Sequence, residues 1–229
     1  MEISKLSKNN KVLIIAAHPD DEILGCGGTI LKLKQTHIIQ VVFLTNGVSA
    51  RTNNKKKIMK RKNECLKLFK YLKIPKPIFF NFPDNKLDTV PLLKITQKIE
   101  KILFKFKQHT VMTHYENCLN IDHQIAFKST ITACRPLKNI SVKKILSFEI
   151  LSSTDWSLFN KKQFQPNYYI DISNNIKKKL ELMKYYKTEL RKYPHSRSLK
   201  GIETLARMRG ISSGTKFSEA FLLVRELKQ

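Results

Sequence analysis

A short apolar run near the start of the chain leads directly into a cluster of ionisable side chains. Residues 12–16 read VLIIA, and His18, Asp20, Asp21 and Glu22 follow almost at once. An apolar run of about four to eight residues indicates a buried strand, here of a parallel sheet, and a helix is expected from about residue 22. Ligands bind at such strand-to-helix junctions in open α/β sheets. Because neighbouring carboxylates repel one another, we expect a cation, most simply a metal ion, to compensate their charge.

Segments with strand and helix periodicity alternate along the rest of the chain. Strands are expected at about 11–17, 38–44, 78–80, 110–113, 144–150 and 168–172, and helices at about 22–35, 53–72, 91–107, 121–134, 174–191 and 200–208. Residues 221–224 fit either a strand or a helix. Such alternation predicts βαβ units, an α/β fold and a mainly parallel sheet. With no repeat or Pro/Gly-rich linker to divide them, residues 1–229 are expected to form one domain.

The chain is strongly basic. Its 43 Lys and Arg residues against 18 Asp and Glu give a formal net charge of +25. This charge favours anionic partners: phosphate-bearing substrates, peripheral contact with an anionic membrane or, least favoured, nucleic acid. Because most of the positive charge is lysine, a solvated helix surface explains much of it without any partner.

The sequence also indicates the cellular compartment of the protein. The N-terminal segment 1–11 is polar and lacks the apolar region of a signal peptide, and no apolar stretch approaches the roughly 20 residues of a membrane span. The four cysteines form no CxxC pair, which argues against zinc-ribbon and thioredoxin sites. We therefore expect a cytoplasmic protein with reduced cysteines. The sequence leaves a homo-oligomer open.

A second polar cluster follows the expected strand at 110–113. It runs from His114 to His123 and includes Asp122. Since parallel strands end at the same edge of a sheet, one of its histidines can join His18 and Asp21 in a His/Asp/His site. Three protein ligands and one open position are typical of catalytic zinc, which lowers the pKa of its bound water to about 7. An adjacent carboxylate can then move the proton.

A simpler interpretation exists for the first cluster. Acids in the first turn of a helix interact favourably with its dipole and often cap it. That would account for any one of Asp20, Asp21 and Glu22. It does not account for His18 or for a second His/Asp cluster at another strand end, so the metal site is the favoured interpretation.

The motifs then resemble a known family. The segments 17–22 (AHPDDE) and 25–28 (GCGG) are similar to the signature of the PIG-L/LmbE-like zinc-dependent N-deacetylases, and 119–123 (LNIDH) is similar to their second motif. The likeness continues through TNG at 45–47, FPDN at 82–85, FE at 148–149, SSTDW at 152–156, YPHSRS at 193–198 and EAF at 219–221. It therefore covers nearly the whole chain.

The resemblance implies a Rossmann-like three-layer α/β/α sandwich that hydrolyses an acetamide, usually on an N-acetylated sugar. The implied metal ligands are His18, Asp21 and His123. Asp20 matches the general base. The positions implied to contact substrate are Arg61, which is similar to a helix arginine, and Asp84, which is similar to an acid that holds a sugar hydroxyl.

Asn120, Asn46 and His195 also bear on the chemistry of the expected site. Several relatives carry histidine where this chain has Asn120. An amide cannot shuttle a proton but can donate a hydrogen bond, so Asn120 is expected to contact the substrate. Asn46 stands where the family often has aspartate. His195, in a context poorly suited to a buried core, is given a role at the substrate, mainly on the strength of the resemblance.

Together these features predict a zinc-dependent hydrolase of linear amide C–N bonds that removes acetate from a sugar of the N-acetylhexosamine type. The candidate carriers of that sugar are a nucleotide, a lipid and a small metabolite. Fe²⁺ or another divalent metal would also accept the ligand set. The alternatives are an amidase for a sugar–thiol conjugate or other small amide, a non-catalytic nucleic-acid-binding protein and a dinucleotide-dependent oxidoreductase. Residues 25–28 are not a GxGxxG fingerprint, and we expect them to permit close packing of helix on sheet.

Overall fold

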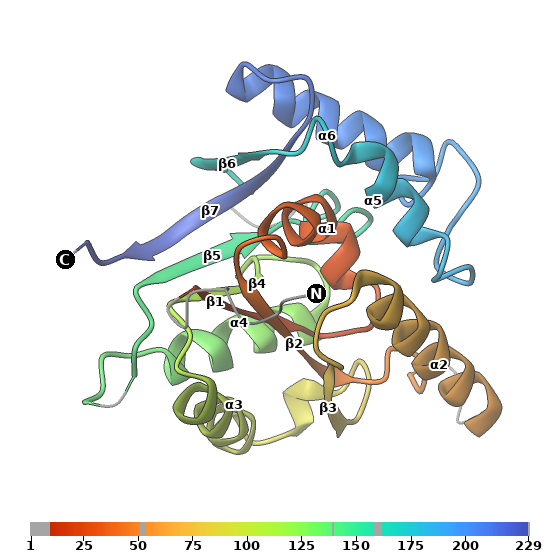
Figure 1. Cartoon of the computed structure of the whole chain (residues 1–229). Coiled ribbons are helices and arrows are strands. Elements are labelled where there is room, and N and C mark those ends of the chain that lie inside the picture. The colour runs from red at the N-terminus through yellow and green to blue at the C-terminus, as the bar shows by residue number, and fades with distance from the viewer. Residues whose placement is uncertain (1–9, 51–53, 139, 158–161, 229) are drawn as a thin grey trace.

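Seven strands form one open sheet in the order β3-β2-β1-β4-β5-β7-β6 (Figure 1). The computed structural model describes residues 10–50, 54–138, 140–157 and 162–228 of the 229-residue chain. Within these ranges the strands are β1 (Lys11–Ala16), β2 (Ile38–Thr45), β3 (Ile78–Phe82), β4 (Thr110–His114), β5 (Lys144–Phe148), β6 (Tyr168–Asp171) and β7 (Ser218–Glu226).

The first five strands run parallel to their neighbours. β1 pairs with β2 on one side and with β4 on the other, β2 pairs with β3, and β4 with β5. β7 is antiparallel to both β5 and β6, so the sheet is mainly parallel, as expected. The chain order reverses at β1, and in open α/β sheets a ligand crevice lies beyond the carboxyl end of that strand.

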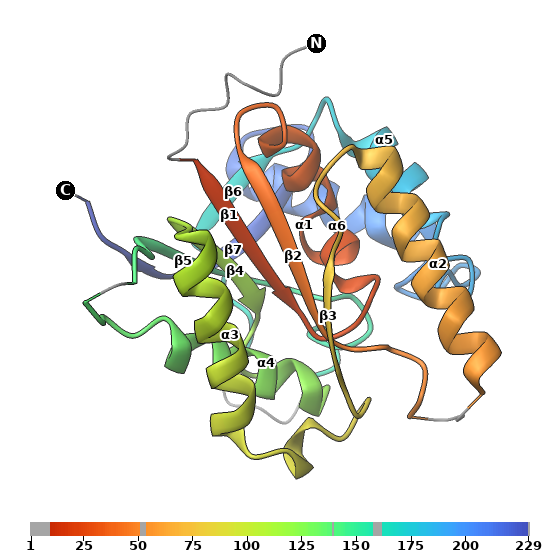
Figure 2. The ribbon, with the colours of Figure 1, turned by 60° about the horizontal axis from the view of Figure 1, so that its bottom comes forward.

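Helices cover both faces of the sheet, which confirms the three-layer sandwich. They are α1 (Asp21–Leu33), α2 (Lys55–Leu72), α3 (Leu92–Phe106), α4 (Ile121–Ala133), α5 (Ile176–Met183) and α6 (Leu199–Ser213), with a short 3₁₀ turn at Leu87–Thr89. One apolar core joins the sheet to α1, α2, α5 and α6, and a second joins it to α3 and α4. Figure 2 shows α2 and α3 flanking the central strands from opposite sides. None of the helices in the described ranges combines the length and apolarity that a bilayer span requires.

The helices near the C-terminus differ from the expectation. The helix expected over 174–191 ends at Met183, because the chain turns there to bury Tyr186 completely. Tertiary contacts of this kind commonly override local propensity. The helix expected over 200–208 continues to Ser213, where Gly214 ends it in the left-handed conformation. The start expected for α2, residue 53, lies outside the described residues.

The small residues at 25–28 bring α1 close to its neighbours, as expected. A Cβ at Gly25 would overlap the ring of Phe148, and a Cβ at Gly28 would come within 2.7 Å of Ile172. Between them, Cys26 leaves helical geometry with φ −146° and kinks α1. The packing interpretation of this motif is therefore confirmed at Gly25 and Gly28.

A buried ion pair ties α5 to β7 and α1. Lys179 Nζ donates to Glu219 Oε1 at 2.6 Å and to the Leu24 carbonyl at 2.9 Å. Glu219 in turn accepts from the backbone amides of Gly28 at 2.8 Å and Thr29 at 2.7 Å. Both side chains of the pair are only 4% exposed, so the contact is shielded from solvent.

We therefore expect Lys179→Met to destabilise the protein. Removing one partner of a buried ion pair leaves the other charge uncompensated, which costs about 3–5 kcal/mol of unfolding free energy. Urea unfolding measures it. The control is Arg207→Ala, whose exposed pair with Glu203 should contribute less than about 1 kcal/mol. Equal stabilities for the two variants would contradict this role of the pair.

Candidate metal centre and cleft

Two loops at the carboxyl edge of the sheet carry the ionisable clusters. The first connects β1, which ends at Ala16, to α1, which begins at Asp21. The second connects β4, which ends at His114, to α4, which begins at Ile121. Because β1 and β4 are parallel neighbours, both loops lie beyond the same edge.

The structure brings His18, Asp21 and His123 together. One ligand atom from each lies within 4.8 Å of the others. His18 Nδ1 is 3.2 Å from Asp21 Oδ2 and 3.3 Å from His123 Nε2, and His123 Nε2 is 3.4 Å from the same carboxylate oxygen. The three side chains are almost fully buried.

These residues fit a divalent cation. Asp21 Oδ1 is buried and has no hydrogen-bond partner among the described residues, although a buried carboxylate oxygen normally has one. Two ring nitrogens and a carboxylate also form a donor set that zinc accepts. The charge of Asp21 is the main reason why the pKa of His123 rises to about 9 although burial lowers it. The local field therefore favours positive charge at this point.

The opposite nitrogen of His18 faces two other carboxylates. His18 Nε2 is 3.2 Å from Asp84 Oδ1 and 3.2 Å from Asp122 Oδ2. Burial lowers the pKa of His18, but hydrogen bonds to Asp122, Asp21 and Asp84 outweigh it and raise the pKa well above its ordinary value. A metal-binding histidine commonly donates its second ring N–H to a carboxylate, which fixes the ring. Asp122 thus orients His18.

His18, Asp84 and Asp122 also lie close together, with one ligand atom from each within 4.8 Å of the others. Here the carboxylates are already bonded to donors. Asp122 accepts the amides of Asn85 at 2.7 Å and Leu87 at 3.0 Å. Asp84 accepts the Thr45 hydroxyl at 3.1 Å and the Ala50 amide at 2.9 Å. The geometry therefore favours the group with His123 as the metal centre.

Asp20 lies beside this centre but outside it. It precedes α1 with φ 140° and ψ −28°, a conformation that non-glycine residues rarely adopt. Its side chain is buried, and Arg197 Nη1 approaches its Oδ2 at 3.3 Å. Burial and the nearby charge of Asp21 raise the pKa of Asp20 to about 6. A carboxylate with a raised pKa next to a cation site can act as a general base.

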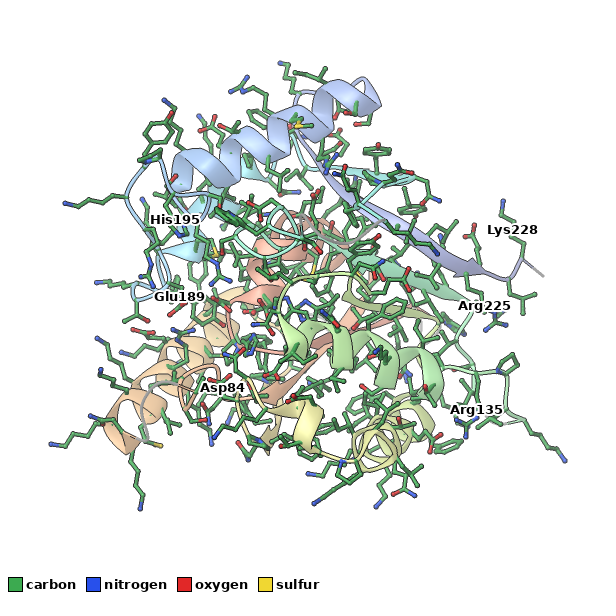
Figure 3. The ribbon with its side chains drawn as sticks, turned by 180° about the vertical axis from the view of Figure 1, so that it is seen from behind. Asp84, Arg135, Glu189, His195, Arg225 and Lys228 are labelled. Carbon is green, nitrogen blue, oxygen red and sulfur yellow. The ribbon has the colours of Figure 1, made fainter. Side chains whose placement is uncertain are left out.

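The residues expected to contact substrate line one cleft. The cleft has a volume of about 770 Å³, and its walls include His18, Asp20, Arg61, Asp84, Asn120 and His195. Figure 3 shows Asp84, Glu189 and His195 on the same side of the molecule, with Arg135, Arg225 and Lys228 on the other.

Several of these groups are already bonded within the protein. Arg61 Nη1 donates to the Pro19 carbonyl at 2.8 Å, and its Nη2 donates to Thr188 Oγ1 at 2.9 Å and to Glu189. Asn120 caps α4 through its side-chain oxygen and donates its amide to Asn85 Oδ1 at 2.9 Å. Both ends of the Asn120 amide are therefore engaged within the protein.

His195 differs from these residues in being exposed. Its Nδ1 accepts the backbone amide of Arg197 at 3.0 Å, which holds the ring against its own turn. No described residue is hydrogen-bonded to its Nε2. The ring nitrogen that remains is therefore available to a ligand in the cleft.

Two further side chains support His123. Cys118 Sγ lies 3.1 Å from His123 Nδ1, and the His114 ring stacks on the His123 ring at 3.9 Å between centroids. Burial raises the pKa of the Cys118 thiol, but the charge and hydrogen bond of His123 outweigh it and the pKa falls. Burial is also the main reason why the pKa of His114 is well below its usual value, and its Nε2 accepts the Ala17 amide at 2.9 Å. Both residues hold the His123 ring in place.

Sequence reasoning assigned no role to Arg197 or Glu189. Arg197 lies inside the quoted YPHSRS segment, which is the signal that could have indicated it. Glu189 was placed inside an expected helix, where a charged side chain suggests a solvated face. The departure of the chain from helical structure after Met183 brings both residues to the cleft.

Fold and cleft define a Rossmann-like α/β protein with a His/Asp/His centre at the switch point of its sheet. The family model "PIG-L: GlcNAc-PI de-N-acetylase" matches residues 13–134, more than half of the 229 residues, and the chain belongs to this family. The matched range contains both ionisable loops. The family resemblance indicated by the motifs is thereby confirmed.

Individual relatives agree with this assignment. Over 168 residues, 71% of this chain and 85% of the relative, the chain is 29% identical to the uncharacterized deacetylase YaiS of Escherichia coli strain K12. N,N'-diacetylchitobiose deacetylase from Pyrococcus horikoshii superimposes with a TM-score of 0.75 at 22% identity, covering 98% of this chain and 88% of that one. GalB, the 4-carboxy-2-hydroxymuconate hydratase of Pseudomonas putida KT2440, gives 0.76 at 15% identity, covering 96% and 98%. At 22% and 15% sequence identity, the likeness to these two solved structures shows the fold alone.

Proposed function

We propose that this chain is a metal-dependent N-deacetylase that releases acetate from an N-acetylated sugar of the N-acetylhexosamine type. The observation that carries the proposal is the convergence of His18 Nδ1, Asp21 and His123 Nε2 within 4.8 Å, with the buried carboxylate of Asp20 beside them in an open cleft. Membership of a de-N-acetylase family supports the reaction class. Zinc is the metal of the proposal, and Fe²⁺ is compatible with the same ligands.

In the proposed reaction, water is added across the amide C–N bond to give acetate and a free amine. A divalent cation held by His18, Asp21 and His123 would polarise the carbonyl and acidify the water. Asp20 accepts the proton of the attacking water and returns it to the nitrogen as the C–N bond breaks. His114 and Cys118 keep the His123 ring in place, and Asp122 does so for His18.

The sugar would lie against the remaining cleft residues. Arg61, Asp84, Asn120 and His195 are the predicted substrate contacts, and all four line the cleft. The hydrogen bonds within the protein leave His195 as the residue with an uncommitted ring nitrogen. With its amide donating to Asn85, Asn120 is assigned no proton in this scheme, and the proton route runs through Asp20.

A substrate panel tests the proposal. Purified protein with one equivalent of Zn²⁺ is incubated with N-acetylglucosamine derivatives and, separately, with sugar–thiol amides, and the acid and amine products are quantified. Acetate release from the N-acetyl sugars supports the proposal. Cleavage of the thiol conjugates alone would favour the amidase alternative, and failure on both sets would refute a sugar-amide hydrolase.

A lysine-lined groove next to the cleft supports a substrate with an anionic carrier. It has a volume of about 820 Å³, and its walls are Lys56, Met59, Lys60, Asn63, Glu64, Lys67, Lys184, Tyr185 and Lys187. Lys60 and Glu64 line both the groove and the cleft. Five lysines against one glutamate make the groove positive, with Met59 and Tyr185 as an apolar surface for the rest of a nucleotide or lipid carrier.

Charge reversal in this groove is expected to discriminate between substrates. The double variant Lys67→Glu/Lys184→Glu should raise KM for a phosphate-bearing N-acetyl sugar by about tenfold, since each near-surface charge contributes up to about 1 kcal/mol. KM for an uncharged methyl glycoside should not change. The control, Lys101→Glu/Lys105→Glu on α3, alters the net charge equally on the opposite face. Equal effects of the two double variants would mean that overall charge alone attracts the substrate.

A further inference from the structure

The peptide bond between Pro19 and Asp20 is held from both sides by hydrogen bonds to buried side chains. Arg61 Nη1 donates to the Pro19 carbonyl at 2.8 Å, and the Asp20 amide donates to Glu22 Oε2 at 3.0 Å. The other oxygen of Glu22 accepts the Tyr186 hydroxyl at 2.6 Å. A residue at φ 140° is strained, and such a conformation persists only where the surroundings fix it.

The carboxylate of Asp20 is held by a second pair of residues. Arg197 Nη1 lies 3.3 Å from Asp20 Oδ2 and 3.4 Å from Glu189 Oε2. Arg197 is itself anchored, because its Nε donates to Ser152 Oγ at 2.6 Å and to the Leu151 carbonyl at 3.3 Å. The guanidinium therefore has little freedom to leave Asp20.

Glu189 joins the two arginines. Its Oε1 accepts from Arg61 Nη2, and its Oε2 faces Arg197 Nη1. Charges of alternating sign thus run from Arg61 through Glu189 and Arg197 to Asp20. One end of this chain fixes the backbone from which Asp20 projects, and the other fixes its carboxylate.

We propose that Glu189 and Arg197 are positioning residues that hold Asp20 Oδ2 so that Oδ1 is the oxygen presented for proton transfer. No described residue is hydrogen-bonded to Oδ1. The inference rests on the proposed function only in taking proton transfer as the role of Asp20. Both positioning residues come from the connection between α5 and α6, so this connection completes the site that β1 and β4 begin.

Arginine suits this position better than lysine. One guanidinium reaches Ser152 through Nε and Asp20 and Glu189 through Nη1, with fixed angles between these directions. A lysine ammonium is a compact charge without such a planar fork. Substitution by lysine should therefore keep the charge near Asp20 and lose the anchoring at Ser152.

Steady-state kinetics of Arg197 and Glu189 variants test the proposal. Arg197→Ala should lower kcat by about 100-fold, because displacing a reacting group by about 1 Å has a cost of that size. KM and the metal content should change little. The kcat of Arg197→Lys should be about tenfold higher than that of Arg197→Ala, because lysine keeps the positive charge near Asp20. Glu189→Gln should lower kcat by about tenfold, the cost of one charge-assisted hydrogen bond.

A matched variant separates this role from loss of structure. Arg209 pairs with Glu149 at 2.7 Å, and its side chain is 15% exposed against 19% for Arg197. Neither Arg209 nor Glu149 lines the cleft. Arg209→Ala should therefore lower the melting temperature and leave kcat unchanged. A normal kcat in Arg197→Ala, or a rise in KM alone, would overturn the proposal.

A second readout does not depend on activity. Crystal structures of the wild type and Arg197→Ala, at a resolution that shows alternative rotamers, should give one Asp20 rotamer in the wild type and more than one in the variant. A single unchanged rotamer in both would overturn the proposal. If Asp20 becomes disordered while the wild type releases no acetate from any N-acetyl sugar, positioning stands and the deacetylase function falls.

Discussion

Replacing Asp20 with asparagine is expected to lower kcat for acetate release by about 10³-fold, within the range for a lost general base. The amide has the shape of the carboxylate but cannot accept the proton. Asparagine matches aspartate in size and branching, so the backbone conformation that Asp20 already adopts at φ 140° should survive. Stopped assays of acetate and amine, with wild-type protein in parallel, measure the effect.

The metal content of this variant is the control. Asp20 is outside the group formed by His18, Asp21 and His123, so Asp20→Asn should bind as much zinc as the wild type. A variant that keeps zinc and loses turnover assigns the defect to proton transfer. A rate within tenfold of the wild type would show that another group moves the proton.

Replacing His123 with alanine is expected to remove metal binding and activity together. The substitution deletes one of three ligands, and even the loss of an outer hydrogen-bond partner weakens binding by about 10- to 100-fold. Because His123→Ala removes a ligand itself, we expect zinc affinity to fall by more than about 100-fold. Competition with a chelator of known affinity, followed by metal analysis, measures it.

Thermal unfolding provides an independent check on this variant. A ligand that binds only the native state raises its stability by mass action. Added Zn²⁺ should therefore raise the melting temperature of the wild type and of His37→Ala, a control at a residue outside both metal groups. It should leave His123→Ala unchanged. A variant that binds zinc normally would mean that His123 is not a ligand.

The sequence predicts most of the fold because local signals agree with one another. The apolar run at 12–16 becomes the interior strand β1, and the alternation of elements specifies a mainly parallel sheet. The helix expected over 174–191 is wrong beyond Met183 for a reason that periodicity cannot reveal. Tyr186 is buried with its hydroxyl donating to Glu22. This contact joins two segments that lie more than a hundred residues apart in the sequence.

The site was predictable to the extent that its residues follow strand ends. His18, Asp21 and His123 could be grouped by that rule and by the family motifs. The role of Asp122 does not follow from that rule: its carboxylate faces His18, and Asn120 is the cap of α4. Which histidine a carboxylate orients depends on side-chain directions that spacing does not specify.

The fold alone does not decide the chemistry. A hydratase superimposes on this chain as well as a chitobiose deacetylase does, which agrees with the rule that function lies in the site rather than the fold. The proposal for this chain therefore depends on the cation and on Asp20 beside it. The requirement for the cation can be tested by a direct titration.

That measurement is acetate release from an N-acetylglucosamine derivative by metal-depleted protein as Zn²⁺ is added back in substoichiometric steps. The protein should be inactive at the start, gain activity in proportion to the zinc added and level off near one equivalent. Acetate release that is already complete without metal, or an enzyme that stays inactive at full occupancy, would contradict a single catalytic cation held by His18, Asp21 and His123.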